Sequence, residues 1–160
     1  MPGYRGHLFG GALMFVAVRL CIAPLIKAHL VSEIACFSLT LLGALFPDVD
    51  IKSKGQKIFY YLALFVAIIC FAKRAWNSLA WLGIMCFFPL AVHHRGPMHN
   101  PYVLIATPWL VSQALGQLFP TLKTLSPLYS LFFIAGALSH LLLDFGLIKT
   151  LKKFIPWDLK

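Results

Sequence analysis

The sequence predicts an all-α fold, a polytopic membrane bundle of about six transmembrane helices that forms a single domain over residues 1–160. Hydrophobic residues make up 60% of the chain and charged residues 12%, whereas soluble domains average about 45–50% and about 25%. The apolar residues gather in stretches close to the ~20 residues that a helix needs to cross ~30 Å of hydrocarbon. Both observations argue against a soluble globular protein and against a disordered chain.

Six apolar stretches follow one another along the chain. They are Leu8–Ile26, Leu30–Phe46, Ile58–Ala72, Ala75–Val92, Pro101–Phe119 and Leu128–Ile148. A backbone in lipid must satisfy its own hydrogen bonds, so we expect each stretch to be a helix. The first stretch is longer than the ~7–15 apolar residues of a signal peptide and has no evident cleavage site, so we expect it to be retained.

The basic residues predict how the bundle is oriented. Six crossings bring both termini to one side of the membrane, which we call side A. Side A carries nine of the 14 Lys and Arg residues, namely Arg5, Lys52, Lys54, Lys57, Arg95, Lys149, Lys152, Lys153 and Lys160. The opposite side carries four. The positive-inside rule then makes side A cytoplasmic. The excess of basic over acidic residues fits anionic headgroups, and no nucleic-acid partner is expected.

The residues able to carry chemistry also gather on side A. Five of the six histidines and three of the five acidic residues fall at side-A helix ends or in side-A loops: His7, Asp48, Asp50, His93, His94, His99, His140 and Asp144. Random scatter would have divided them between the two sides, so we expect these groups to form one site.

Local spacing supports convergence of these groups. His140 and Asp144 are four residues apart in a predicted helix and therefore project from one face. Gly136, one turn earlier on that face, would let a neighbouring helix approach closely. Asp48 and Asp50 follow Pro47 and alternate, so in an extended loop both would point the same way.

The loop between the fourth and fifth stretches supplies two further histidines and an arginine. Gly96-Pro97 predicts a turn that brings His94 and His99 together. Arg95 would hold an anionic substrate oxygen through its planar guanidinium group.

Histidine and aspartate at separate positions are typical of a divalent metal site. The candidate ligands are His7, Asp48, Asp50, His94, His99, His140 and Asp144. Seven exceed the three or four that one zinc ion needs, so we expect one or two divalent ions per chain, with zinc as the first choice. Asp48 or Asp50 would serve as a general base or as a bridging ligand, and we assign catalytic roles to Asp50 and Arg95.

The order of these motifs resembles the YdjM-type membrane-bound metal-dependent hydrolases. The matching segments are His7, Phe46-Pro47-Asp48-Val49-Asp50, His94-Arg95-Gly96 with His99, and Ser139-His140 with Asp144. The resemblance implies that these residues are metal ligands of a multi-pass hydrolase of the inner membrane. A distant likeness of the helix that carries His140 and Asp144 to zinc phospholipase C and P1-type nucleases makes phosphoester cleavage the first expectation.

A site at headgroup level suggests a lipid or lipid-linked substrate, and the sequence does not indicate an oligomeric state. Two alternatives stay open. The first is a proton- or metal-coupled transporter, because intramembrane His and Asp also form proton or ion pathways. The second is a catalytically silent membrane partner protein, since Met98 and Asn100 stand where the family usually carries Thr and Ser.

Some polar residues admit simpler interpretations. Asp48 and Asp50 could simply end and cap a helix, without binding a metal. His140 and Asp144 could form a simple His–Asp pair. Arg19 and Glu33 are expected to form a structural ion pair away from the site. His29 is expected to be a surface residue.

Overall fold

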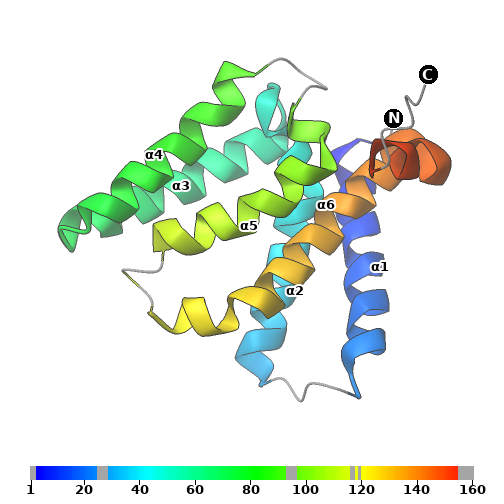
Figure 1. Cartoon of the computed structure of the whole chain (residues 1–160), viewed down its shortest axis with the longest axis horizontal. Coiled ribbons are helices and arrows are strands. Elements are labelled where there is room, and N and C mark those ends of the chain that lie inside the picture. The colour runs from blue at the N-terminus through cyan, green and yellow to red at the C-terminus, as the bar shows by residue number, and fades with distance from the viewer. Residues whose placement is uncertain (1–2, 25–28, 93–96, 116–117, 119, 155–160) are drawn as a thin grey trace.

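The computed structural model describes residues 3–24, 29–92, 97–115, 118 and 120–154, and every regular element among them is helical. The elements are α1 (Tyr4–Ile22), α2 (Leu30–Leu45), η1 (Phe46–Asp50), α3 (Lys54–Ala72), α4 (Trp76–Ala91), η2 (Pro97–His99), α5 (Pro101–Leu115) and α6 (Pro120–Phe154). The two η elements are short 3-10 helices. The predicted all-α fold is confirmed, and the six α-helices follow the six predicted stretches in order (Figure 1).

Within the described part of the chain, four segments are long and apolar enough to cross a membrane: Tyr4–Ile22, Leu30–Asp50, Lys54–Ala72 and Pro127–Lys152. The helices α4 and α5 have 16 and 15 residues, or about 24 and 22 Å at 1.5 Å per residue. Both are shorter than the ~30 Å hydrocarbon core. The fifth predicted stretch ran to Phe119, but its helix ends at Leu115.

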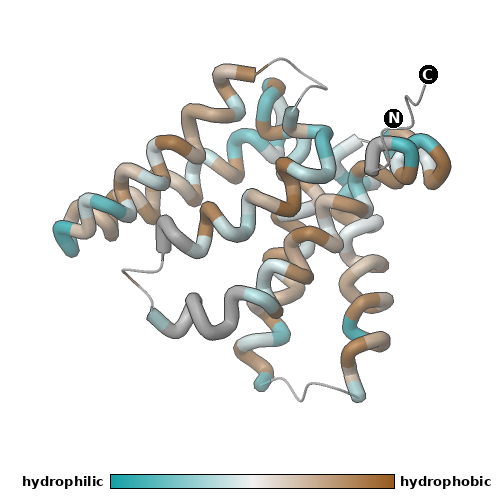
Figure 2. Tube along the Cα trace, viewed as in Figure 1, coloured by the Kyte–Doolittle hydropathy of each residue, from teal (hydrophilic) through white to brown (hydrophobic). Residues whose placement is uncertain are grey.

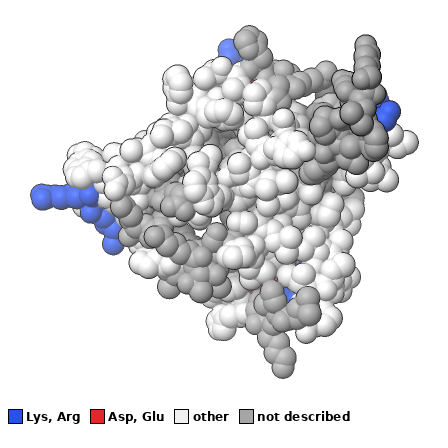
Figure 3. Space-filling view, in the orientation of Figure 1, with Lys and Arg blue, Asp and Glu red and all other residues white. Residues whose placement is uncertain are grey.

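The outer surface of the bundle is apolar. Large side chains such as Phe9, Phe65 and Phe87 are more than half exposed, which costs little when the surroundings are acyl chains. Hydrophobic colour runs along the helices in Figure 2. In Figure 3 the Lys and Arg of the described residues lie mainly at the margins of the face in view. The protein is a membrane protein, as the composition predicted.

Helices α2 and α6 cross closely because each presents a glycine to the other. A Cβ atom on Gly136 would collide with the backbone carbonyl of Thr40, and one on Gly43 would collide with that of Phe133. The small-residue contact predicted at Gly136 is therefore present. This contact brings the last turn of α2 against the turn of α6 that follows Gly136 and carries His140.

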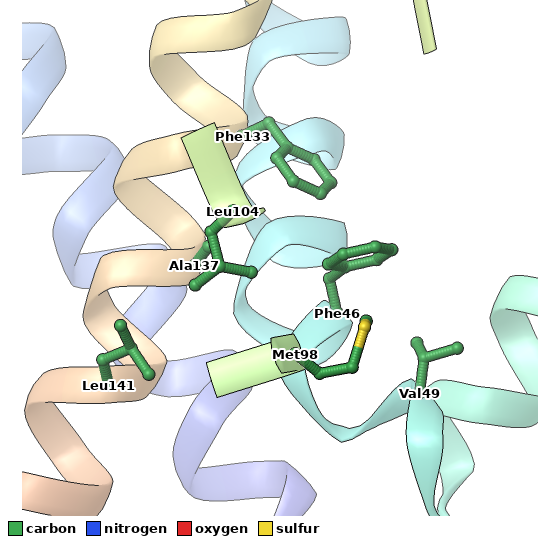
Figure 4. Packing of buried hydrophobic residues seen from close by; sticks show 7 residues of the cluster. All are labelled: Phe46, Val49, Met98, Leu104, Phe133, Ala137 and Leu141. Carbon is green, nitrogen blue, oxygen red and sulfur yellow. The ribbon is translucent and has the colours of Figure 1, made fainter. Parts of the chain in front are cut away.

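The side-A ends of the helices converge, and the other ends spread apart (Figure 1). The start of α1 and the end of α6 lie near this convergence, while α3 and α4 lead away from α1 and α2. The short helices η1 and η2 contact one another at the convergence. Phe46, Val49 and Met98 pack here with Phe133 of α6 into a buried apolar cluster (Figure 4). This cluster fixes the short helices η1 and η2, which carry Asp48 and His99.

Helix α6 bends sharply just after its two candidate ligands. Gly146 has φ 74° and ψ 167°, a conformation that costs glycine little and other residues more. Beyond the bend, the Thr150 hydroxyl donates to the Leu141 carbonyl at 3.0 Å. The last segment of α6 is thereby tied back to the turn that carries His140.

Candidate metal centre

Helix α1 places His7 against His140. We expected His7 to precede the first helix, but α1 begins at Tyr4, so His7 lies near the end of its first turn. The side chain is buried, and its ring stacks on the His140 ring with centroids 3.8 Å apart and planes 14° from parallel. Gly11, one turn later, lets α1 approach Ala44 of α2.

His140 is fully buried, and one ring nitrogen has a defined role. Its Nδ1 lies 2.8 Å from the backbone carbonyl oxygen of Ala44. A carbonyl can only accept a hydrogen bond, so Nδ1 must carry the proton. In the neutral ring, Nε2 then presents a lone pair. Such a bond from the second ring nitrogen is typical of metal-ligating histidines.

The Nε2 atom of His140 faces two carboxylates. It lies 3.5 Å from Oδ1 of Asp48 and 3.5 Å from Oδ2 of Asp144. The Nε2 atom of His99 lies 3.8 Å and 3.9 Å from the same two oxygens. Two imidazole nitrogens therefore alternate with two carboxylate oxygens. The other oxygen of Asp144, Oδ1, lies 3.6 Å from Nε2 of His7.

These separations fit the ligand shell of an ion better than direct hydrogen bonds. Protein N–H···O bonds measure about 2.7–3.2 Å. Donor atoms held about 2.0–2.2 Å from one tetrahedral ion stand roughly 3.3–3.6 Å from one another. The observed 3.5–3.9 Å is close to that range and slightly wider. Buried His140 Nε2 makes no hydrogen bond within the described part of the chain.

Two overlapping sets of three residues satisfy the geometry of a metal site: His7 with His140 and Asp144, and Asp48 with His99 and His140. Within each set the ligand atoms lie within 4.8 Å of one another. Both sets use His140, whose Nδ1 is already bonded to Ala44. Nε2 has a single lone pair to offer, so His140 can serve only one ion.

Asp50 does not join these sets among the described residues. We expected Asp48 and Asp50 to share a direction in an extended loop, and that expectation is wrong because the segment is the 3-10 helix η1. With three residues per turn, residues two apart point about 120° apart. Pro47 at the start of η1 and the Ser53 hydroxyl, which donates to the Asp48 carbonyl at 2.8 Å, favour this compact form.

Three predicted groups lie outside the described residues. His94, proposed as a ligand, Arg95, proposed to bind the substrate, and the neighbouring His93 all belong to residues 93–96. Their roles, including the predicted approach of His94 to His99, stay predictions from the sequence.

A family model described as YdjM inner membrane protein matches residues 1–160. The chain belongs to this family. The match covers every segment on which the resemblance rested, and it agrees with the membrane-spanning helices. The comparisons with curated proteins and with solved structures found no match.

The residues that we expected to lie away from the centre belong to neither ligand set. Arg19 and Glu33 form the predicted ion pair between α1 and α2. His29 is exposed at the start of α2, where its Nδ1 accepts from the Val31 amide at 3.5 Å.

Sequence reasoning missed the backbone carbonyl of Ala44. An alanine gives no sign that its carbonyl orients a histidine 96 positions later. The available signal was the glycine at 136, which predicted a close helix contact one turn before His140.

Proposed function

We propose that this protein is a metal-dependent hydrolase that cleaves a phosphoester in a lipid or lipid-linked substrate at the cytoplasmic membrane face. The observation that carries the proposal is the arrangement of His99, His140, Asp48 and Asp144, with nitrogen–oxygen separations of 3.5–3.9 Å. A zinc ion is the cofactor that suits these donors best.

Burial supports a cation at this place. The Asp144 side chain is 5% exposed, within a segment apolar enough to span a membrane. An aspartate at the centre of such a helix costs roughly 2.5–3.5 kcal/mol on insertion scales. Asp144 lies nearer the helix end, but its buried carboxylate still needs a compensating charge. Among the described residues, the side chains within ion-pair distance of Asp48 and Asp144 are histidines. A divalent ion would compensate two carboxylates more fully than neutral imidazoles can.

The buried and the partly exposed residues of the centre would have different roles. A divalent ion held here would activate a water nucleophile and polarise a phosphoryl oxygen. Asp144 and His140 are buried and would hold the ion. Asp48 has a side chain that is 25% exposed, and it would therefore reach the substrate side of the centre, where it could accept a proton from water.

Cationic groups near the start of α1 suit an anionic substrate. Arg5 Nε donates to the Tyr4 hydroxyl at 3.2 Å, and Lys54 Nζ donates to the same oxygen at 3.2 Å. His7 lies one turn beyond Tyr4. Arg5 and Lys54 thus bring positive charge to the start of the helix that carries His7, and Arg95 would add a third cation.

Hydrolysis by the purified protein tests the proposal. The assay uses a panel of phosphomonoesters, phosphodiesters and phospholipids, measured after chelation and after addition of zinc. We expect zinc to restore cleavage of at least one phosphoester in the wild type and not in His140→Ala. The matched change His29→Ala should leave cleavage intact. Metal that binds and moves across vesicle membranes without any cleavage would favour the transporter.

A further inference from the structure

A second feature lies beside the centre: an apolar cavity of about 280 Å³ within the bundle. Its walls come from α2, η1, α3, α4, α5 and α6, and they include Leu42, Phe46, Ala63, Met85 and Phe133. No charged side chain is among the described residues that line it.

Four of the residues that line the cavity carry a hydroxyl group, namely Thr107, Ser112, Tyr129 and Ser130, and two of these hydroxyls are bonded within α5. Thr107 donates its hydroxyl hydrogen to the Val103 carbonyl at 2.8 Å, and Ser112 donates to the Trp109 carbonyl at 2.7 Å. Both hydroxyls are thus satisfied within α5. A water needs about two to four polar partners to be held in a cavity. The lining therefore favours an apolar occupant.

The length of the cavity matches one leaflet. Along α3 its wall runs from Gly55 to Val66, a rise of eleven residues or about 16 Å at 1.5 Å per residue. Half of the ~30 Å hydrocarbon core is about 15 Å. Gly55 lies one residue after the start of α3, at the side-A end. With α3 along the membrane normal, the cavity would extend from the level of the headgroups to the middle of the membrane.

The cavity and the metal centre share a wall. Phe46 and Val49 line the cavity and flank Pro47-Asp48 in η1. Figure 4 shows Phe46 and Val49 beside Met98, the residue before His99. A molecule with a phosphate at Asp48 and a hydrocarbon chain would therefore meet the cavity directly next to its headgroup.

We infer that the cavity binds one acyl chain of a phospholipid whose phosphate lies at the His and Asp centre. This assignment rests on the proposed function and names its substrate class. Binding gains little from hydrophobic transfer, because the chain leaves an environment that is equally apolar. Its benefit is position: the cavity holds the phosphoester at the centre, where proximity accelerates the reaction.

Photo-crosslinking tests the cavity without any need for hydrolysis. The full-length protein is placed in phosphatidylethanolamine vesicles with phosphatidylglycerol that carries a diazirine near the end of one acyl chain. We expect the label on Val66 and Val111, at the inner end of the cavity. Ala63→Phe, which places a ring in the cavity, should lower this labelling about tenfold. Ala80→Phe, the same change on the exposed face of α4, should not.

A second variant keeps the test informative if Ala63→Phe fails to fold. Val66→Phe narrows only the inner end, so it should lower labelling by long chains more than labelling by short ones. Label spread over outward-facing side chains, with no response to either variant, would overturn the inference.

The two proposals fail separately. If the cavity is labelled as expected but no phosphoester is cleaved, the hydrolase proposal is wrong and the lipid site stands. If a phosphoester is cleaved and the cavity is not labelled, the acyl-chain assignment is wrong. Asp144→Asn should lose cleavage and keep the label, because Asp144 does not line the cavity.

Discussion

At the scale of single residues, His140 connects the fold to the chemistry. Its Nδ1 is bonded to the Ala44 carbonyl in α2, and its Nε2 faces Asp48 and Asp144. Packing therefore decides both the direction of the ring and the nitrogen that it offers. A histidine at the same depth without this acceptor could turn or change tautomer, and its value as a ligand would fall.

Asp48 and Asp50 provide the sharpest comparison at this scale. Asp48 is in a ligand set, and Asp50, two residues on, is not. We predict that Asp48→Asn weakens zinc binding by more than the ~10–100-fold that loss of an outer-shell partner costs. Asp50→Asn should leave zinc affinity within a few-fold of the wild type. Competition with a fluorescent chelator measures both.

An equal loss of affinity in the two variants would contradict the arrangement of η1. It would place both carboxylates at the ion, as the extended loop expected from the sequence would have done. Asp50 would then recover the ligand role assigned to it from the sequence.

At the scale of elements, the α2–α6 contact positions the site. Gly136→Ala would drive a methyl group into the Thr40 carbonyl, and backbone cannot move aside as a flexible side chain can. We predict a loss of about 1–3 kcal/mol of stability, as for other overpacked contacts. Weaker zinc binding should accompany it because His140 would move away from Ala44.

Gly83→Ala is the matched control for this change. Gly83 is also helical, in α4, and a Cβ atom there would meet nothing within 4 Å. Alanine is favoured over glycine in a helix by up to about 1 kcal/mol, so thermal unfolding should be unchanged or slightly later. If Gly136→Ala unfolds like Gly83→Ala, the close contact does not contribute to stability.

Much of the structure at the scale of elements could be predicted from the sequence. Hydropathy located the six helices and their order, since a span of apolar residues in lipid must be helical. The spacing of His140 and Asp144 indicated a shared face. Local patterns could not show that η1 is a 3-10 helix or that α6 continues past the bend at Gly146, because both depend on neighbours distant in sequence.

At the scale of the whole molecule, the candidate residues can meet only if the helix ends that carry them lie on the same side of the membrane. The side-A ends of the helices converge in the structure (Figure 1), and five candidate ligands lie together there: His7, Asp48, His99, His140 and Asp144. Parity and counting of polar residues predicted this convergence. The apolar cavity could not be predicted in that way, since its lining residues resemble any other core residues in the sequence.

Orientation in the membrane is a prediction at this scale. Nine basic residues on side A should keep it cytoplasmic. Reporter fusions after Lys54 and after Lys123 should therefore report opposite sides, with Lys54 in the cytoplasm. Reports from the same side would contradict six crossings, and would show that one of the shorter helices, α4 or α5, does not span.

Metal content tests the central claim most directly. Purified protein is loaded with zinc, freed of unbound ion and analysed for metal per chain. The wild type and His29→Ala, a histidine change at the exposed start of α2, should hold at least about one ion per chain. Asp144→Asn and His140→Ala should insert normally into the membrane and retain little zinc. Full zinc occupancy in both of these variants would contradict the account, and would leave His140 and Asp144 as a buried structural pair.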